Sequence, residues 1–431
     1  MVKRNRQRGR PRSLDYVPPF IERNIPYFDF CSVEQLEAIE AHVDWLLAEV
    51  GVEFRQDPKA LDILRAGGVD VQGVTARFPD GLARKLCATI PPEFTQVARN
   101  PQKTVRIGGR NQVFAPAYGS PFIYDLKNGR RYGTIADFNN LVKLVKDLPN
   151  LHHSGGVLVE PCDVPVNKRH LDMVYGHLRY SDKPLLGMIT AKERAEDSVD
   201  LAKIVFGADF MQQNVVIMGN VNMNSPMMID KVASEAIQVY CEANQAIIVA
   251  PFILGGAMGP VTTPAGVAQA LAEAMAAGAF SQLVKPGAAF VMGNFLSSMS
   301  LKSGAPTFGM PEPVMSNYMI GQLARRLGIP LRCGGSLTAA KICDAENNPY
   351  FRLVSNALFV MTAFNLMNAF VGPAYETAQN TLMSTSEIVD IYGANWVVWN
   401  VFFGLYALVF LRSAGKDLLP KWGVTFGTIV G

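Results

Sequence analysis

Aromatic side chains placed after apolar segments are the residues of this chain whose types best suit a chemical task. A quaternary ammonium group cannot be met by hydrogen bonds, whereas the face of an aromatic ring attracts it by about 0.5–2 kcal/mol. The rings we consider are Tyr118, Phe122, Phe252, Phe295 and Tyr318. Each of them could equally belong to the hydrophobic core, which takes most aromatic residues.

Asparagines recur at every second position in the stretch from Asn220 to Asn224. Alternate residues of a strand point to the same side, so Asn220, Asn222 and Asn224 would line one wall. Asn220 and Asn222 are our candidates for hydrogen bonds to a carboxylate or to the polar side chain of a large ligand. The competing interpretation is that these amides satisfy the backbone of a loop.

Glycine pairs and a lone acid complete the set of candidates. Gly255 and Gly256, like Gly334 and Gly335, would let a flat macrocycle approach the backbone, although both pairs also suit ordinary turns. Glu312 would either offset the charge of a bound cation or favour the start of the helix that Pro313 opens. Neither glycine pair forms a nucleotide-binding motif.

A repeating pattern of strand-like and helical stretches must position these residues. Apolar runs begin near Leu151, Pro184, Asn214, Ala246, Ala288 and Pro330. Helical stretches fill the gaps at 135–148, 168–180, 192–206, 228–244, 264–283 and 312–327. With residues 113–117 as a first strand, the pattern predicts seven units of a TIM-type (βα)8 barrel, an α/β fold whose active site lies at the C-terminal ends of the strands.

The chain divides into four parts by composition. We predict a disordered basic tail at residues 1–26 and an N-terminal helical extension at 27–110. The barrel is predicted at 111–345, and a divergent C-terminal part follows at 346–431. Within the extension, Ser32 and Gln35 form a capping-box pattern at the start of a helix. An Asn-Gly pair at 128–129 predicts a hairpin.

Composition narrows the classes of function. The net charge is only +3, and the excess of basic residues lies in the first twelve positions, so we expect no nucleic-acid partner. Six scattered cysteines without paired spacing indicate a reduced, cytoplasmic protein without a structural zinc site. With five histidines, we expect no intrinsic catalytic metal, and His152 and His153, at the start of a strand, are expected to be structural.

Five stretches of the chain resemble the trimethylamine methyltransferase family. They are FAPAYGSP at 114–121, PFILGGAMGPVT at 251–262, QLVKPG at 282–287, GAP at 304–306 and CGGSLT at 333–338. The resemblance extends over residues 30–345 and implies a barrel that moves a methyl group from a methylamine to a Co(I) corrinoid. Members that act on trimethylamine carry pyrrolysine in the loop where this chain has Pro313.

The chain therefore resembles the branch without pyrrolysine, whose characterised members act on quaternary amines such as glycine betaine. The resemblance implies a quaternary or tertiary methylamine as substrate and a corrinoid carried by a separate partner protein. The residues expected to face that corrinoid are Gly255, Gly256, Pro313, Gly334, Gly335 and Ser336. The sequence does not identify a catalytic side chain. It is compatible with a homo-oligomer.

The C-terminal part departs from the family pattern. Residues 396–411 are sixteen positions without a charge, just below the usual length of about 17–25 for a membrane helix. They either complete the barrel or associate with a membrane. The alternative function is accordingly a non-catalytic, membrane-associated protein that binds quaternary amines.

Overall fold

The computed structural model describes residues 18–79, 81–125 and 128–334, which belong to the first of two compact units, Met1–Gly334. Most of the predicted basic tail, the C-terminal part and the segment 396–411 lie outside the described residues. So do Gly335 and Ser336.

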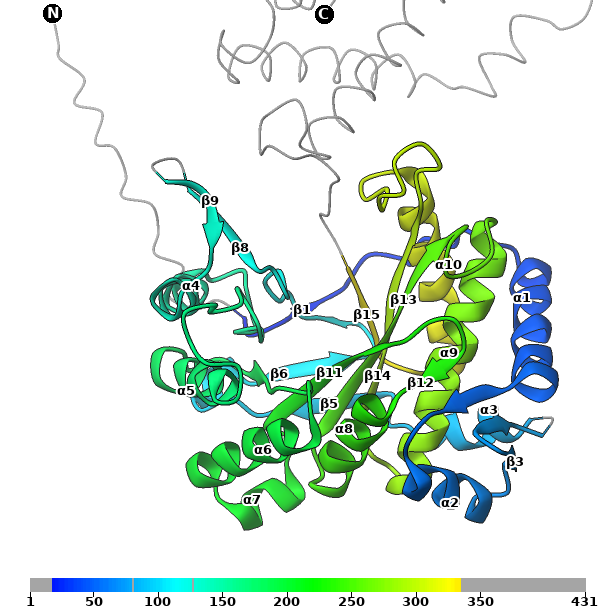
Figure 1. Cartoon of the computed structure of the whole chain (residues 1–431), viewed down its shortest axis with the longest axis horizontal. Coiled ribbons are helices and arrows are strands. Elements are labelled where there is room, and N and C mark those ends of the chain that lie inside the picture. The colour runs from blue at the N-terminus through cyan, green and yellow to red at the C-terminus, as the bar shows by residue number, and fades with distance from the viewer. Residues whose placement is uncertain (1–17, 80, 126–127, 335–431) are drawn as a thin grey trace, which may run out of the picture. The chain divides into compact units, whose positions relative to one another are not determined.

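Five parallel strands form the central sheet (Figure 1). In spatial order they are β10 (Leu185–Leu186), β11 (Ile217–Met223), β13 (Ala246–Gly255), β14 (Phe290–Ser298) and β15 (Leu331–Cys333). Every neighbouring pair is parallel and follows the order of the chain, as βαβ units require. The sheet is a curled parallel half-barrel, and the predicted α/β class is confirmed.

Two further segments extend this order before β10. Ser154 N donates to Pro184 O at 2.8 Å, and Gly119 N donates to Val157 O at 2.7 Å. Residues 114–120, residues 152–160 and the five strands thus lie side by side in the order predicted from the seven apolar runs. The predicted eighth strand, which would close the barrel, lies in the C-terminal part of the chain, outside the described residues.

Helices connect these strands at the predicted gaps. They are α4 (Ile135–Asp147), α5 (Arg169–Tyr180), α6 (Lys192–Phe206), α7 (Ala208–Gln213), α8 (Lys231–Glu242), α9 (Thr263–Val284) and α10 (Pro311–Leu327). Among the described residues, α9 is the one helix long and apolar enough to cross a membrane, but 89% of that stretch is buried inside the protein. It is apolar on all sides because it packs against α1, α2, α3, α8, α10, β13 and β14.

The N-terminal part contains the predicted helices and also two small sheets. Its helices are α1 (Val33–Trp45), η1 (Leu46–Val50), α2 (Pro58–Ala66), α3 (Leu82–Cys87) and η2 (Pro101–Lys103). One sheet joins β1 (Ile21–Glu22), β7 (Asn111–Gln112), β6 (Val105–Gly108) and β5 (Glu93–Gln96), and the other joins β12 (Met228–Ile229), β2 (Val52–Phe54), β4 (Thr75–Arg77) and β3 (Asp70–Gln72).

Two local sequence signals in the first third of the chain are confirmed. The side chains of Ser32 and Gln35 each accept from the other residue's backbone N–H, which is the predicted capping box of α1. β8 (Phe122–Asp125) and β9 (Gly129–Tyr132) form the predicted hairpin, which stands out from the neighbouring elements in Figure 1.

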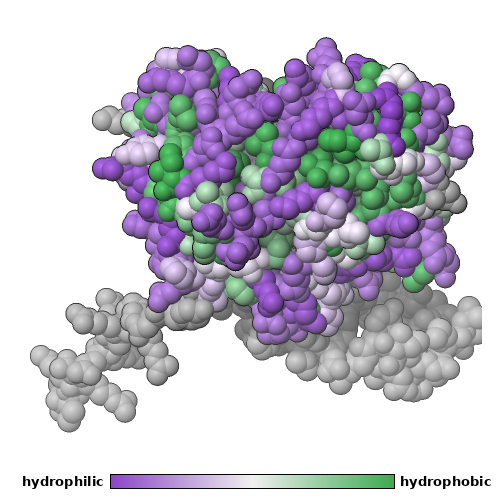
Figure 2. Space-filling view, turned by 90° about the horizontal axis from the view of Figure 1, so that it is seen from below, coloured by the Kyte–Doolittle hydropathy of each residue, from purple (hydrophilic) through white to green (hydrophobic). Residues whose placement is uncertain are grey.

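A small apolar cluster occupies the N-terminal end of the half-barrel interior. Its buried members are Leu186, Met218, Ala246, Ile248, Ala289 and Val291. Phe94 of β5 and Ile107 of β6 pack against them, so the N-terminal sheet covers this end. Hydrophilic side chains dominate the face seen from below Figure 1, with hydrophobic ones in separate areas (Figure 2). Because the apolar cluster and the N-terminal sheet fill one end of the half-barrel interior, the interior positions that remain for a ligand lie at the C-terminal ends of the strands.

Candidate functional site

Asn220 and Asn222 continue the interior face of β11 beyond the apolar cluster. They follow Met218 at intervals of two residues, and alternate residues of a strand share a face. Asn220 is 2% exposed and its Oδ1 has no hydrogen-bond partner among the described residues, whereas Asn222 is exposed. The strand thus runs from an apolar base through a buried amide to an accessible one. Asn224 instead donates to Asp230 and does not join this set.

Tyr118 lies beside Asn220 in the interior. Its ring packs against the apolar cluster, and its hydroxyl hydrogen-bonds the Asn220 side chain. Burial raises the pKa of Tyr118 from its ordinary value, so the phenol stays neutral near pH 7. A neutral phenol that accepts one hydrogen bond still has a proton to donate.

Phe252 and Phe295 meet at the C-terminal ends of β13 and β14, as two of the predicted aromatic residues should. They are register partners in the sheet, and their ring centroids lie 5.3 Å apart. Phe308, from the loop after β14, places a third ring with its centroid 5.5 Å from that of Phe295. We call these three residues the aromatic cluster. Its spacing is typical of aromatic contacts, and a ring face can attract a cation.

Phe122 and Tyr318 do not join the aromatic cluster. Phe122 belongs to the β8–β9 hairpin, where Arg130 places its guanidinium 3.7 Å from the ring centroid. Tyr318 is exposed on α10 and packs edge-on against Phe28 at 5.2 Å. These contacts engage both rings with other side chains of the chain, and the contact of Phe122 and Tyr318 with substrate stays a prediction.

The candidates expected to face a corrinoid lie at the ends of strands or the start of a helix. Gly255 ends β13, and Gly256 follows it with a positive φ of 92° that favours glycine. Glu312 and Pro313 lie in the first turn of α10, where Glu312 is exposed. Gly334 follows β15, and its carbonyl accepts from Asn317 Nδ2 at 3.3 Å.

Arg332 is an interior residue that the sequence reasoning missed. It pairs in register with Gly293 of β14, and it interacts electrostatically with Tyr118 and His153 across the interior. Burial lowers the pKa of Arg332, but a guanidinium remains charged. The signal that could have found it is its place on the last predicted strand, directly before the glycine pair.

The histidines at the start of the second strand segment are structural, as expected. His153 accepts from Gly155 N at 2.9 Å and faces Gln96 Oε1 at 3.1 Å, so its Nε2 carries the proton. His177 behaves similarly between Ser154 Oγ, at 2.7 Å, and the carbonyl of Gly156. Burial lowers the pKa of His153 to about 3 and that of His177 to about 4.

These two neutral imidazoles predict a loss of stability in mild acid. Below pH 6.5 the unfolded chain binds protons that the folded protein does not, so the free energy of unfolding falls as the pH falls. We expect a loss of about 2 kcal/mol for each imidazole between pH 7 and pH 5. Denaturant unfolding at several pH values measures it, and a constant free energy of unfolding over this interval would contradict the prediction.

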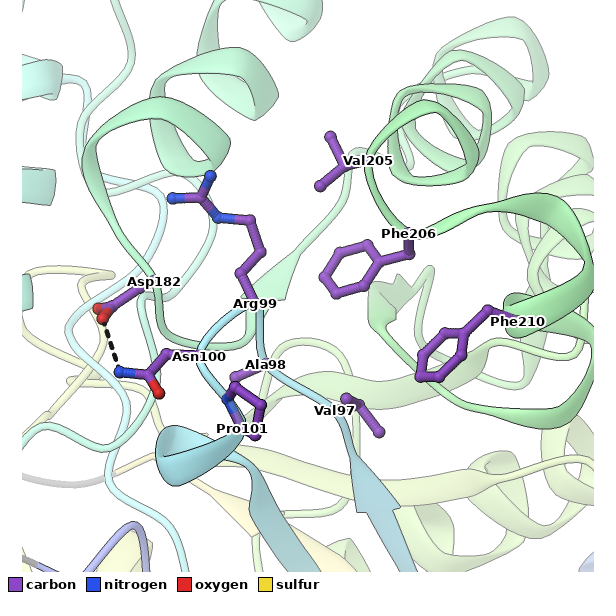
Figure 3. Close-up of a pocket in the computed structure, with 9 residues that line it drawn as sticks. All are labelled: Val97, Ala98, Arg99, Asn100, Pro101, Asp182, Val205, Phe206 and Phe210. Atoms are coloured by element: carbon purple, nitrogen blue, oxygen red, sulfur yellow. Dashed lines mark hydrogen bonds between the residues drawn. The ribbon is translucent and has the colours of Figure 1, made fainter.

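One open pocket lies away from the interior site, beside the start of β10 (Figure 3). It has a volume of about 650 Å³ and is lined by Val97, Ala98, Arg99, Asn100, Pro101, Asp182, Val205, Phe206 and Phe210. Phe206 and Phe210 lie on one side and the segment after β5 on the other, where Asn100 donates to Asp182 at 3.1 Å. Residues at this end of a barrel usually serve stability, so we do not place the site here.

Comparisons with known proteins found a matching family model and several similar proteins. The family model described as trimethylamine methyltransferase (MTTB) matches residues 2–357. The glycine betaine methyltransferase of Desulfitobacterium hafniense is 34% identical over 82% of this chain and 75% of its own length. The proline betaine:corrinoid methyltransferase of Eubacterium limosum is 23% identical over 80% of this chain and 71% of its own length.

Among solved structures, the monomethylamine methyltransferase of Methanosarcina barkeri aligns with 69% of this chain and 65% of its own length. The identity is 10% and the TM-score 0.41.

Proposed function

The chain belongs to the trimethylamine methyltransferase family, and from this premise we propose that it moves a methyl group from a betaine-like quaternary amine to the Co(I) corrinoid of a partner protein. Because the chain belongs to this family and is 34% identical to a glycine betaine methyltransferase, it is a corrinoid-linked methyltransferase. The observation that carries the choice of substrate is the aromatic cluster, because three ring faces can hold a cation that forms no hydrogen bonds.

The task of the protein in this reaction is to position the donor. In the transfer, the carbon–nitrogen bond breaks, its electron pair stays on nitrogen, and the methyl group becomes bonded to cobalt, which is formally oxidised from Co(I) to Co(III). The leaving group is a neutral tertiary amine, so no side chain must protonate it first. Alignment of one methyl carbon with the nucleophile is worth several kcal/mol in barrier height.

The residues around the C-terminal ends of the strands suit a docking corrinoid protein. Apolar side chains are exposed in the loops after β13 and β14, with Val261 80% and Leu301 88% exposed. Gly255 and Gly256 add a stretch of backbone without side chains, which a flat ring can approach closely. We therefore propose this face for the partner and assign the cobalt to the partner. Among the described residues, no group of three or more His, Cys, Asp or Glu side chains could hold a metal.

A methyl-transfer assay tests the proposed function. The purified protein is mixed with a reduced corrinoid protein and with glycine betaine, proline betaine, choline or trimethylamine. We expect the absorbance of methylated corrinoid to appear with a betaine, together with one equivalent of the demethylated amine by mass spectrometry. Absence of methyl transfer from every quaternary amine in the panel would overturn the proposal.

We also propose that the protein is cytoplasmic. This rests on the sequence and on the five cysteines in the described residues, which are all free. Cell fractionation tests it, and recovery of the protein in washed membranes would support the alternative based on residues 396–411.

A further inference from the structure

Arg332 of β15 places a positive charge inside the half-barrel. It lies level with two small residues on the neighbouring strands, Gly293 of β14 and Ala250 of β13. Its register partner is Gly293, and a Cβ on Gly293 would lie 2.4 Å from the Cβ of Ala250 on the next strand. Gly293 and Ala250 therefore place no large side chain on β14 and β13 at the level of the Arg332 backbone. As the register partner of Gly293, Arg332 is on the same side of the sheet as Val291 and Phe295, which is the interior side.

The described part of the chain offers no carboxylate for this guanidinium. No ion pair or hydrogen bond joins Arg332 to any residue between 18 and 334, while other arginines find partners. Glu160, the acid that interacts electrostatically with Tyr118, is itself paired with Arg169 at 2.6 Å. Arg332 is half-buried, so an anion that enters from solvent can reach its guanidinium, and a half-buried guanidinium without a partner favours binding of such an anion.

Other hydrogen-bond donors lie around the same space. The Tyr118 hydroxyl, which takes part in the Asn220 hydrogen bond, is neutral and retains a proton to donate. Asn222, one step further along β11, presents an exposed amide on the interior face. A guanidinium, a phenol and an amide together match the four lone-pair sites of a carboxylate.

The aromatic cluster lies directly beyond this group of donors. Phe295 is two residues after Gly293 on β14, and two residues of a strand advance by about 6.6 Å along the same face. The negative end of a small zwitterion would thus lie deeper in the half-barrel than its positive end. The cationic end would lie among the rings of Phe252, Phe295 and Phe308, near the exposed loops.

We propose that Arg332, assisted by Tyr118 and Asn222, binds the carboxylate of an amino-acid betaine and holds its trimethylammonium group toward the exposed loops. This deepens the proposed function and rests on it for the reaction itself. The Arg332 contact would make the enzyme select carboxylated betaines over choline, tetramethylammonium and trimethylamine. A bidentate guanidinium–carboxylate pair also limits rotation of the substrate, so its methyl groups face one direction.

Direct binding measurements test this without a corrinoid partner. Calorimetry compares glycine betaine with its methyl ester, which keeps the cation but loses the negative charge. We expect the wild-type protein to bind glycine betaine at least about 30-fold more tightly than the ester, as one charge-assisted pair of hydrogen bonds implies. Equal affinity for the two ligands would overturn the proposal without any variant.

The variant Arg332→Gln should raise the Kd of glycine betaine by about 30-fold and leave the Kd of the ester within about threefold. Arg332→Lys, which keeps the charge but not the fork of donors, should recover part of the affinity for glycine betaine. Arg326→Gln is the matched control, because Arg326 lies on α10 and pairs with Glu40 away from the interior. An equal loss for both ligands in Arg332→Gln would show a structural role only.

The two proposals fail in distinguishable ways. If the selectivity for the carboxylate is present but no corrinoid accepts a methyl group, the assignment of Arg332 stands and the proposed reaction falls. If methyl transfer occurs equally from betaine and ester, the reaction stands and the assignment of Arg332 falls.

Discussion

Replacing Phe252 by alanine should weaken the binding of glycine betaine about 10-fold more than the binding of 3,3-dimethylbutyrate. The two ligands share their shape and their carboxylate, but only the first carries a positive charge on its central atom. Phe252 and Phe295 lie 5.3 Å apart by ring centroids, and loss of one ring removes about 1–2 kcal/mol of cation–π attraction. Competition binding to the purified variant measures both affinities.

The neutral ligand controls for packing, because both ligands lose the same contact area when the ring is removed. Phe210→Ala serves as the control for the protein, since this ring lies in the pocket beside the start of β10 and is 42% exposed. It should change neither affinity. If Phe252→Ala weakened the charged and the neutral ligand equally, the aromatic cluster would act by shape alone and the cation–π role would be refuted.

Replacing Lys183 by methionine should lower the free energy of unfolding by about 3 kcal/mol. Lys183 is 6% exposed, and its Nζ donates to the carbonyls of Val145, Leu148 and Leu151 at 2.7, 2.9 and 2.7 Å. Methionine preserves the packing of the stem but leaves three carbonyl groups without this donor. Denaturant unfolding followed by circular dichroism measures the loss.

A surface lysine provides the comparison for this variant. Lys203 pairs with Asp200 on the exposed side of α6, and Lys203→Met should cost less than about 0.5 kcal/mol. Lys183 connects the end of α4 to the start of β10, so its loss should also loosen the segment that carries His153. Equal stabilities of the two methionine variants would mean that the three carbonyls find water instead.

Much of the framework follows from local patterns in the chain. The apolar runs and the helical stretches between them correspond to the described strands and helices, because side-chain periodicity is set by the geometry of each element alone. The same logic located Phe252, Phe295, Asn220 and Asn222, since the C-terminal ends of parallel strands meet at one edge of a sheet.

The composition of the site depended on contacts between segments far apart in the chain. Phe122 and Tyr318 satisfied the same residue-type criterion as Phe252, yet Arg130 and Phe28 engage their rings. Phe308 and Arg332 matched no motif and became visible through their neighbours. Periodicity tells which side of its own element a residue faces, but the identity of what lies opposite is a property of packing between elements, which no local window contains.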